Sequence, residues 1–359
     1  MTYEQTLDYL YNQLPVFQQI GAKAYKPGLQ NSEALDRYFG YPHRKFKTIH
    51  IAGTNGKGST SHLLAAILQK SGYKTGLYTS PHLIDFRERI RVNGEMISQS
   101  YIINFTEKHI PKTKNIHPSF FELTMMMAFD YFAYCQVDVA IIETGLGGRL
   151  DSTNIISPDL AIITNISYDH MQFLGHTLPE IAREKAGIIK EGSVVVNYPD
   201  QPAEAMGPIL TAAAEAHTSI ITPDKDDLTL LRGKRLENRI DYGGYRAALG
   251  LPGTHQANHA AMAVEIALAL WREFGYDISD DAILQGLADA RMPARIEVLR
   301  RHPLLLLDGC HNPDGAKMLA ATLTRADFEE NLVGVLGVLA DKDYKEMLSD
   351  LAPCFAKVY

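Results

Sequence analysis

Cysteine is scarce in this sequence. Its 359 residues include three cysteines, Cys135, Cys310 and Cys354, which are far apart and odd in number. This spacing gives neither the paired framework of a disulfide-rich secreted domain nor the closely spaced ligands of a zinc site. We therefore expect a protein of the reducing cytoplasm, without structural disulfides or a cysteine-bound metal.

Long hydrophobic runs and a surplus of basic residues are also missing. No uninterrupted apolar stretch approaches membrane-spanning length, and residues 1–5 do not have the basic start of a secretory signal. The formal net charge of −7 provides no general attraction to nucleic acid or to an anionic membrane. We expect no nucleic-acid partner, no membrane association and a monomer whose anionic ligands are held by local positive groups.

The sequence does contain a series of short apolar runs, each followed by polar or glycine-rich residues. They span residues 48–52, 137–142, 160–165, 193–197, 304–307 and 332–338. Apolar runs without alternation are typical of parallel strands that helices cover on both faces. Helical patterns lie between them, over 59–70, over 255–274 before Gly275, and after the capping box of Thr177 and Glu180. This alternation predicts an α/β fold with a doubly wound, mostly parallel sheet and ligands at the carboxyl ends of its strands.

The length and a break in the pattern predict two domains. The segment 291–295 interrupts the alternation, and a new strand-glycine-helix unit follows it. We place the boundary at Ile296, with a larger nucleotide-binding domain over 1–296 and a smaller, Rossmann-like α/β domain over 297–359. Residues 200–244 have mixed charge and little periodicity, which predicts peripheral hairpins.

A glycine-rich turn follows the first predicted strand. It reads Gly53-Thr54-Asn55-Gly56-Lys57-Gly58-Ser59 and leads into a helix, so backbone N–H groups and a helix N-terminus are available to phosphates. The spacing departs from the common Walker pattern because Gly58 separates Lys57 from Ser59. A flexible turn without a ligand is the alternative, but the flanking strand and helix favour phosphate binding.

Polar residues follow two neighbouring predicted strands. Glu143 comes directly after the run 137–142, and Asp169-His170 follow the run 160–165 after a short loop. Both lie at the sheet edge where the glycine-rich turn opens. Mg²⁺ prefers oxygen ligands, so Glu143, the Ser80 hydroxyl and nucleotide phosphates suit it, with His170 an unusual addition. Each residue also has a structural explanation, Glu143 as a cap for the following turn and His170 as a partly buried core histidine.

Two other groups of polar residues are ambiguous from their pattern alone. Lys185 lies in the helix that follows Thr177, where a solvated helix face is the usual explanation of such charges. Arg87, Arg89 and Arg91 alternate, which predicts one face of a strand, either solvent-exposed or facing a ligand.

In the smaller domain, Cys310 and His311 follow the run 304–307. Because residues adjacent in sequence rarely face each other, this pair does not predict an activated thiolate. We interpret Cys310 as a small filler and His311 as the polar residue facing a ligand.

Taken in order, these motifs resemble those of bifunctional folylpolyglutamate synthase/dihydrofolate synthases, a Mur ligase family, over nearly the whole chain. The matching segments are 50–59, 79–83, 87–90, 143–151, 169–170, 184–188, 255–256 with 258, 308–309 with 311–313, and 340–343. Two departures are Ala294 before Arg295, where the family usually has glycine, and Cys310, where it usually has alanine. The chain ends at Tyr359, before the family's second domain is normally complete, so we expect that domain to be incomplete.

The resemblance implies a P-loop-containing sheet of the Mur ligase central-domain type, and it implies roles for particular residues. ATP would bind Thr54, Asn55, Gly56, Lys57, Gly58, Ser59, Asn258, Arg295 and Asp308. Mg²⁺ would bind Ser80, Glu143 and His170. The pterin substrate would bind His82, Phe120, Phe121, Glu122, Leu123, Leu150, Asp151 and Ser152. Lys57, Lys185 and His311 would be catalytic, with Lys185 carboxylated by CO₂.

The activity implied by this resemblance is the ATP-dependent addition of L-glutamate to dihydropteroate or to a reduced folate. The γ-phosphoryl group of ATP would convert the carboxylate into an acyl phosphate, which the amine of glutamate then attacks. Another Mur-type amino-acid ligase and a non-catalytic nucleotide-binding module are the alternatives.

Overall fold

The computed structural model describes residues 1–15, 28–233, 235–326, 328, 331–339 and 342–359. Its centre is an eight-stranded sheet in the order β4-β3-β2-β5-β1-β6-β7-β8. The strands are β1 (Lys47–Ala52), β2 (Thr75–Tyr78), β3 (Ile90–Val92), β4 (Glu95–Met96), β5 (Val139–Glu143), β6 (Leu160–Ile163), β7 (Val194–Asn197) and β8 (Ile220–Ile221). All neighbouring pairs from β2 to β8 are parallel, whereas β3 and β4 pair antiparallel at one edge. The predicted doubly wound, mostly parallel sheet is confirmed.

Side chains of the central strands alternate between two cores. In β1, Ile49 and Ile51 pack into one core and Ala52 into the other; in β6, Leu160 and Ile162 likewise oppose Ile163. Because both faces are covered, most positions on either face are apolar, which explains the hydrophobic runs in the sequence.

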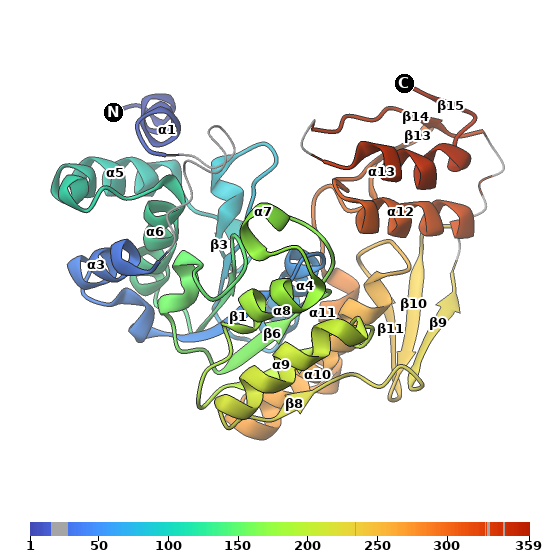
Figure 1. The fold of residues 1–359 in the computed structure, drawn as a ribbon, viewed down its shortest axis with the longest axis horizontal. Helices are drawn as coiled ribbons and strands as arrows, with labels where there is room; N and C mark the ends of the chain where they lie inside the picture. The colour runs from blue at the N-terminus through green and yellow to red at the C-terminus, as the bar shows by residue number, and fades with distance from the viewer. Residues whose placement is uncertain (16–27, 234, 327, 329–330, 340–341) are drawn as a thin grey trace.

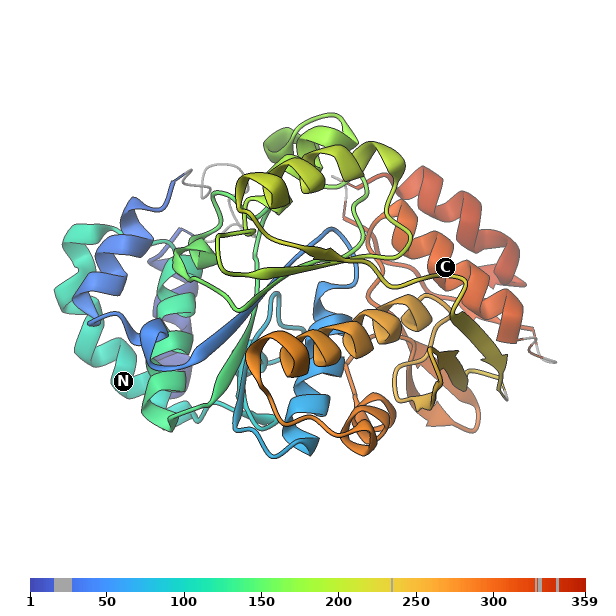
Figure 2. The same cartoon turned by 90° about the horizontal axis from the view of Figure 1, so that it is seen from below.

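Helices form a layer on each face of the sheet. Figure 2 shows the sheet between α8 (Leu178–Ala186) and α9 (Ala203–Glu215) on one side and α4 (Lys57–Lys70) and α10 (Gln256–Phe274) on the other. The capping box at Thr177 and Glu180 opens α8, and Gly275 ends α10 with φ 71°, both as predicted. The helix α11 (Asp280–Asp289) packs against α4 outside this layer.

Aromatic and methionine-rich helices cover the β2–β5 part of the sheet. The buried face of α6 (Phe120–Cys135) forms the centre of this core, and α1 (Tyr3–Asn12), α3 (Gln30–Tyr38) and α5 (Gln99–Thr113) pack around it (Figure 1). Short helical segments complete the region: η2 (Pro42–Lys45), η3 (Phe86–Arg89), η4 (Lys114–Ile116) and η5 (Ser152–Ile155). The segment η3 contains Arg87 and Arg89, so the predicted strand face of three alternating arginines is wrong; only Arg91 lies in a strand, β3.

The segment 200–244 is only partly made of hairpins. A meander of β9 (Leu228–Arg232), β10 (Asn238–Tyr242) and β11 (Tyr245–Leu249) confirms that part of the prediction. However, residues 203–215 form α9, whose Ala205, Ile209 and Ala213 pack on the sheet. Pro208 lies inside this helix, and with Gly207 it masked the helical pattern in the sequence.

The C-terminal residues build small sheets of their own. The strands β12 (Glu297–Arg301) and β13 (Leu304–Leu307) pair antiparallel, and β14 (Val333–Gly334) pairs in parallel with β15 (Lys357–Val358). The prediction of a buried parallel strand at 304–307 is therefore wrong, because alternate residues of β13 are exposed. The predicted strand over 332–338 is reduced to two residues.

Two helices pack beside these strands. They are α12 (Pro313–Ala326) and α13 (Tyr344–Leu351), followed by η6 (Ala352–Cys354), and they share a small core of Ala316, Met347 and Leu351. The domain boundary at Ile296 stays a prediction. Ala340 and Asp341 of the last predicted motif lie outside the described residues.

None of the helices in the described part of the chain is both long and apolar enough to cross a bilayer.

Candidate active site

The carboxyl ends of four adjacent parallel strands meet at one edge of the sheet. Ile51 of β1 pairs with Glu143 of β5, and Ala52 pairs with Ile163 of β6. Tyr78, the last residue of β2, pairs with Ile142 of β5. This register brings the segments that follow each strand together, as expected for ligand sites of doubly wound sheets.

The glycine-rich loop lies between β1 and α4 and is held closely by its neighbours. A Cβ atom at Gly53 would lie 1.7 Å from the Thr164 hydroxyl oxygen, so no larger residue fits there. Gly56 has φ 86°, and a Cβ on it would lie 2.0 Å from Cε1 of His259. Lys57 Nζ donates to the carbonyl oxygens of Gly53 at 2.9 Å and Thr54 at 3.1 Å. The loop is therefore preformed, with its lysine beside the helix N-terminus.

Lys185 reaches this loop from α8 and is not on a solvated helix face. Its side chain is buried, with 4% of the residue exposed, and its Nζ donates to the carbonyl oxygen of Gly53 at 2.7 Å. Burial, followed by the neighbouring charge of Lys57, lowers the pKa of Lys185 well below its usual value. Both effects disfavour the ammonium form and favour a neutral amine.

Glu143 and Ser80 are brought together at the same edge. The backbone N–H of Ser80 donates to Oε2 of Glu143 at 3.2 Å. Burial raises the pKa of Glu143, although Lys57, the Ser80 N–H and Arg295 act in the opposite direction. A buried carboxylate among cationic groups is a suitable hard oxygen donor for a divalent cation.

A second carboxylate, Asp169, connects the sheet edge to the C-terminal residues. Lys342 Nζ donates to its Oδ1 at 2.8 Å, and Nε2 of His170 and Nε2 of His311 each lie 3.9 Å from its Oδ2. Burial alone would raise the pKa of Asp169, but His170 and Lys342 outweigh it and bring the pKa to about 2. The structure thus places His170 and His311, predicted for different roles, around one anion.

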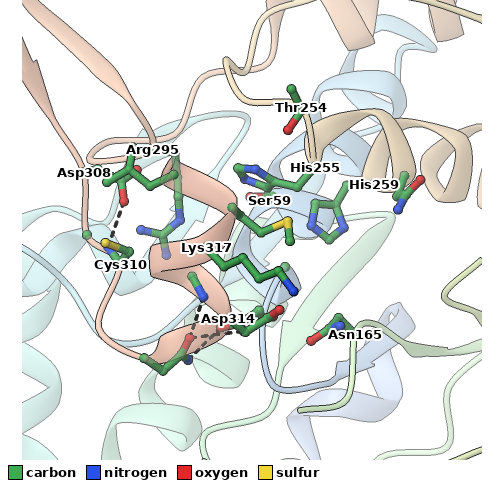
Figure 3. A pocket seen from close by; sticks show the side chains of 18 of the residues that line it. Ser59, Asn165, Thr254, His255, His259, Arg295, Asp308, Cys310, Asp314 and Lys317 are labelled. Atoms are coloured by element: carbon green, nitrogen blue, oxygen red, sulfur yellow. Dashed lines mark hydrogen bonds between the residues drawn. The ribbon is translucent and has the colours of Figure 1, made fainter. Parts of the chain in front are cut away.

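A cavity of about 500 Å³ opens beside the glycine-rich loop. Of the predicted ATP-binding and catalytic residues, those lining it are Asn55, Gly56, Ser59, Asn258, Arg295, Asp308 and His311. Figure 3 shows Arg295, Asp308 and Cys310 on one side, His255 and His259 on the other, and Lys317 extending between them. The size suits a mononucleotide whose phosphates face the loop. Thr54, Lys57 and Gly58 belong to the same loop but do not line the cavity.

Asn55 joins the loop to α12. Its Nδ2 donates to Oδ2 of Asp314 at 2.7 Å, and its Oδ1 accepts from Nδ2 of Asn312 at 2.9 Å. The phosphate loop and the C-terminal wall of the cavity are therefore held together by side chains of both.

The predicted pterin-site residues fall into two groups. His82, Phe120 and Phe121 lie in an aromatic cluster: the ring of Phe120 stacks on Tyr11 at 5.3 Å, and Phe121 packs against Gly145 just beyond Glu143. Phe120 is itself buried, so the partly exposed apolar surface next to the carboxylate comes from Phe121 and His82.

The second group of predicted pterin-site residues is involved in local structure. Glu122 accepts from the Ser119 N–H at 2.6 Å in the capping box of α6, and Asp151 accepts from Gly145 N–H at 2.9 Å and Leu146 N–H at 2.8 Å. Leu123 is buried in the core and lines a separate cavity of about 400 Å³. Leu150 and Ser152 flank Asp151 and are half-buried.

Of the predicted metal ligands Ser80, Glu143 and His170, only Glu143 and His170 belong to the residue types that commonly bind metal ions through several protein side chains. In the described ranges no group of three or more His, Cys, Asp or Glu side chains is arranged to hold a metal ion. Ser80 and Glu143 are in contact, whereas His170 contacts Asp169.

Some cavity residues were not assigned a role from the sequence. His255 is the N-cap residue of α10 and His259 lies in its first turn, and neither Nδ1 has a hydrogen-bond partner among the described residues. Tyr198 accepts from Asn258 Nδ2 at 2.9 Å and lies beside the His259 ring. The i, i+4 spacing of the two histidines was the available signal.

Comparisons with known proteins agree with this geometry. A family model of the Mur ligase middle domain matches residues 51–267, so the fold and the phosphate loop are those of a Mur-type ligase. The dihydrofolate synthase/folylpolyglutamate synthase of Bacillus subtilis is 39% identical over 340 residues, covering 91% of this chain and 79% of the relative. The folylpolyglutamate synthase of Lacticaseibacillus casei is 35% identical, covering 89% and 77%.

Solved structures extend the likeness to the whole backbone. An FPGS–AMPPCP–folate complex has a TM-score of 0.88 at 32% identity, covering 99% of this chain and 88% of that one. Mycobacterium tuberculosis folylpolyglutamate synthase with ADP and AMPPCP has a TM-score of 0.85 at 34% identity, covering 99% and 81%. The chain belongs to the folylpolyglutamate synthase/dihydrofolate synthase family.

The buried His259 predicts a specific pH dependence of stability. Burial, then His255 and Arg295, lowers its pKa to about 3, so it stays neutral in the folded protein while the unfolded chain takes up a proton below about pH 6.5. Stability is therefore lost as the pH falls from 6.5 towards 3. Between pH 7 and pH 5 we expect wild type to lose about 2 kcal/mol more unfolding free energy than His259→Phe. Urea titrations of both proteins at the two pH values measure this; equal losses would contradict it.

Proposed function

We propose that this chain is an ATP-dependent ligase that joins the amino group of L-glutamate to the carboxylate of dihydropteroate or of a reduced folate. The observation that carries the proposal is the common edge where Lys185 contacts Gly53 of the phosphate loop and Ser80 contacts Glu143. The relatives of similar sequence have these two activities in their names.

The nucleotide would lie in the cavity beside the loop. Backbone N–H groups at the start of α4 and the Lys57 ammonium face its phosphates, while Asn258, Arg295 and Asp308 line the remainder. Asn55 links loop and α12, so nucleotide binding and the position of the C-terminal wall are coupled.

The carboxylate substrate would lie between the aromatic cluster and Glu143. The half-buried Phe121 offers a ring for a pterin or its aminobenzoyl group, with the buried Phe120 behind it as support, and Gly145 allows Phe121 to approach the strand end. The ring system of the substrate would thus lie on the apolar side, with its carboxylate at the charged edge where the phosphate loop opens.

The reaction needs no protein nucleophile. A carboxylate oxygen attacks the γ-phosphorus of ATP, the bond to the β,γ-bridging oxygen breaks, and ADP leaves. The amine of glutamate then attacks the acyl carbon, loses a proton and displaces inorganic phosphate. The protein contributes positioning and charge: Lys57 faces the phosphates, and we assign His311, exposed beside Asp169, to the γ-phosphate or glutamate side.

Magnesium fits the residues at this edge. Glu143 provides a buried oxygen donor next to Ser80, and we assign His170 as a third ligand. When bound, the ion would neutralise negative charge on the transferring phosphoryl group.

Lys185 meets the conditions for carbamate formation. Its amine is buried, close to Lys57 and shifted towards the neutral form that reacts with CO₂. The product is an anion beside the phosphate loop, where it would balance Lys57 and support metal binding. We place the enzyme in the cytoplasm as a monomer.

Replacing Lys185 tests the carbamate directly. Protein incubated with ¹³C-bicarbonate should show a carbamate carbon signal in the wild type that is absent from Lys185→Met. Turnover of the variant should fall at least about 100-fold, the range for losing one preorganised charged group. Lys190→Met is the matched control, because the Nζ of that half-buried lysine donates only to the Asn154 and Ile156 carbonyl oxygens among the described residues. An unchanged carbon signal in Lys185→Met would contradict the assignment.

The activity is tested by phosphate release. Purified protein with ATP and L-glutamate should release phosphate when dihydropteroate or a reduced folate is added, and Lys57→Met should lower this rate about 100-fold or more. Release only with cell-wall nucleotide precursors would favour a different Mur-type ligase. Nucleotide binding without substrate-dependent release would favour a non-catalytic module.

A further inference from the structure

Arg89 is a buried cation at the substrate edge. It is the last residue of η3 and only 2% of it is exposed. Its carbonyl oxygen accepts from the Thr79 N–H at 3.0 Å, which fixes it next to Ser80. Its guanidinium lies over the ring of Phe120 at 5.3 Å. Arg89 therefore stands between the aromatic cluster and the Ser80–Glu143 pair.

The guanidinium is only partly satisfied. Its Nε donates to Nδ1 of His82 at 2.7 Å, and the other ring nitrogen of His82 contacts the Tyr11 hydroxyl at 3.1 Å. Because Nδ1 accepts this bond, His82 is neutral and does not balance the charge; burial and then Arg89 lower its pKa to about 4. Within the described ranges, Nη1 and Nη2 of Arg89 have no hydrogen-bond partner, and no carboxylate lies within ion-pair distance.

The nearby carboxylates are already engaged. Glu88 accepts from the backbone N–H groups of Leu83, Ile84 and Asp85, and Glu143 accepts from Ser80. The ring face of Phe120 offsets only part of the cost of burying a cation. A buried charge without a paired anion is strongly unfavourable, so such an arrangement indicates an anionic ligand.

The neighbouring arginine shows the contrast. Arg87, two residues earlier, donates from Nε and Nη2 to Asp85 at 3.0 Å and 2.6 Å and is partly exposed. It is a paired surface arginine, whereas Arg89 faces inward with two free nitrogens. The hydroxyl of Tyr78, beside Arg89, is also buried without a partner in the described part of the chain.

We propose that Arg89 binds a substrate carboxylate through its two Nη groups, with the Tyr78 hydroxyl as a further donor. A planar guanidinium is matched to a planar carboxylate, and burial strengthens the pair. The inference deepens the proposed function and rests on it. Two substrates carry such a group: the pterin compound, through the carboxylate to be activated, and glutamate, through its α-carboxylate. In either position Arg89 orients the group next to Glu143 and the phosphate loop.

Ligand binding and steady-state kinetics of Arg89→Gln, Arg89→Lys and Arg87→Gln test the proposal. By calorimetry, wild type should bind dihydropteroate about 10- to 100-fold more tightly than its carboxamide, as expected for a charge-assisted pair. Arg89→Gln should bind both compounds equally and Arg89→Lys should retain part of the difference, whereas Arg87→Gln should behave like wild type. Undiminished binding of an ATP analogue shows that each variant is folded.

The outcomes separate the two carboxylates. If Arg89→Gln loses carboxylate discrimination for dihydropteroate, the acceptor substrate is the ligand; if it instead raises only the KM for glutamate, the α-carboxylate is. Unchanged discrimination together with an unchanged KM for glutamate would overturn the proposal. Absence of substrate-dependent phosphate release in the wild type would count against the proposed function and not against the binding result.

Discussion

Parallel alignment of β1, β2, β5 and β6 is the constraint on which the remaining structure depends. Their register places the residues after Ala52, Tyr78, Glu143 and Ile163 at one edge. The phosphate loop, Ser80, the glycine-rich turn at 145–148 and Asp169 all follow from this alignment. A shift of one strand by a single residue would move its side chains from one core to the other and displace the residues that follow it, so the two cores described above also protect the geometry of the site.

Buried charge is concentrated at this edge. Lys185 lies on the loop carbonyl of Gly53, Glu143 on the Ser80 N–H, and Arg89 on a neutral histidine, so none of the three has a full ion-pair partner among the described residues. Burial shifts the pKa of Lys185 down and that of Glu143 up, towards their neutral forms, and leaves Arg89 a buried cation without a paired anion, which lowers the stability of the free protein. A bound nucleotide, metal ion or substrate carboxylate would each offset part of the electrostatic cost of these buried groups. The same charges would then favour both substrate binding and catalysis.

A second connection joins the loop to the C-terminal residues. Asn55 contacts Asn312 and Asp314, and Asp169 contacts Lys342. Asn55 and Asn312, 257 positions apart in the sequence, thereby line the same cavity. The predicted roles of Arg295, Asp308 and His311 depend on this juxtaposition.

Much of the central sheet could be predicted from the sequence, because strands covered on both faces are unbroken apolar runs and Gly56 and Gly275 mark necessary turns. The helix α9 was missed because Pro208 contradicts a helical pattern that is supported by packing on α8 and the sheet. The pairing of β12 with β13 depends on a tight turn and not on hydrophobicity. Likewise, the alternation of arginines at 87–91 was visible in the sequence. The burial of Arg89 and the pairing of Arg87 with Asp85 could not be predicted, because both depend on the conformation of η3. Motif order identified the phosphate loop and Glu143, whereas His259 is defined only by its approach to Gly56 in space.

The central claim is that this edge activates a carboxylate as an acyl phosphate. Dihydropteroate labelled with ¹⁸O in its carboxylate, turned over with ATP and L-glutamate, tests it most directly. The account predicts one labelled oxygen in each phosphate released and one retained in the amide product, because a carboxylate oxygen bridges carbon and phosphorus in the intermediate. Phosphate that carries no label from the carboxylate would contradict it.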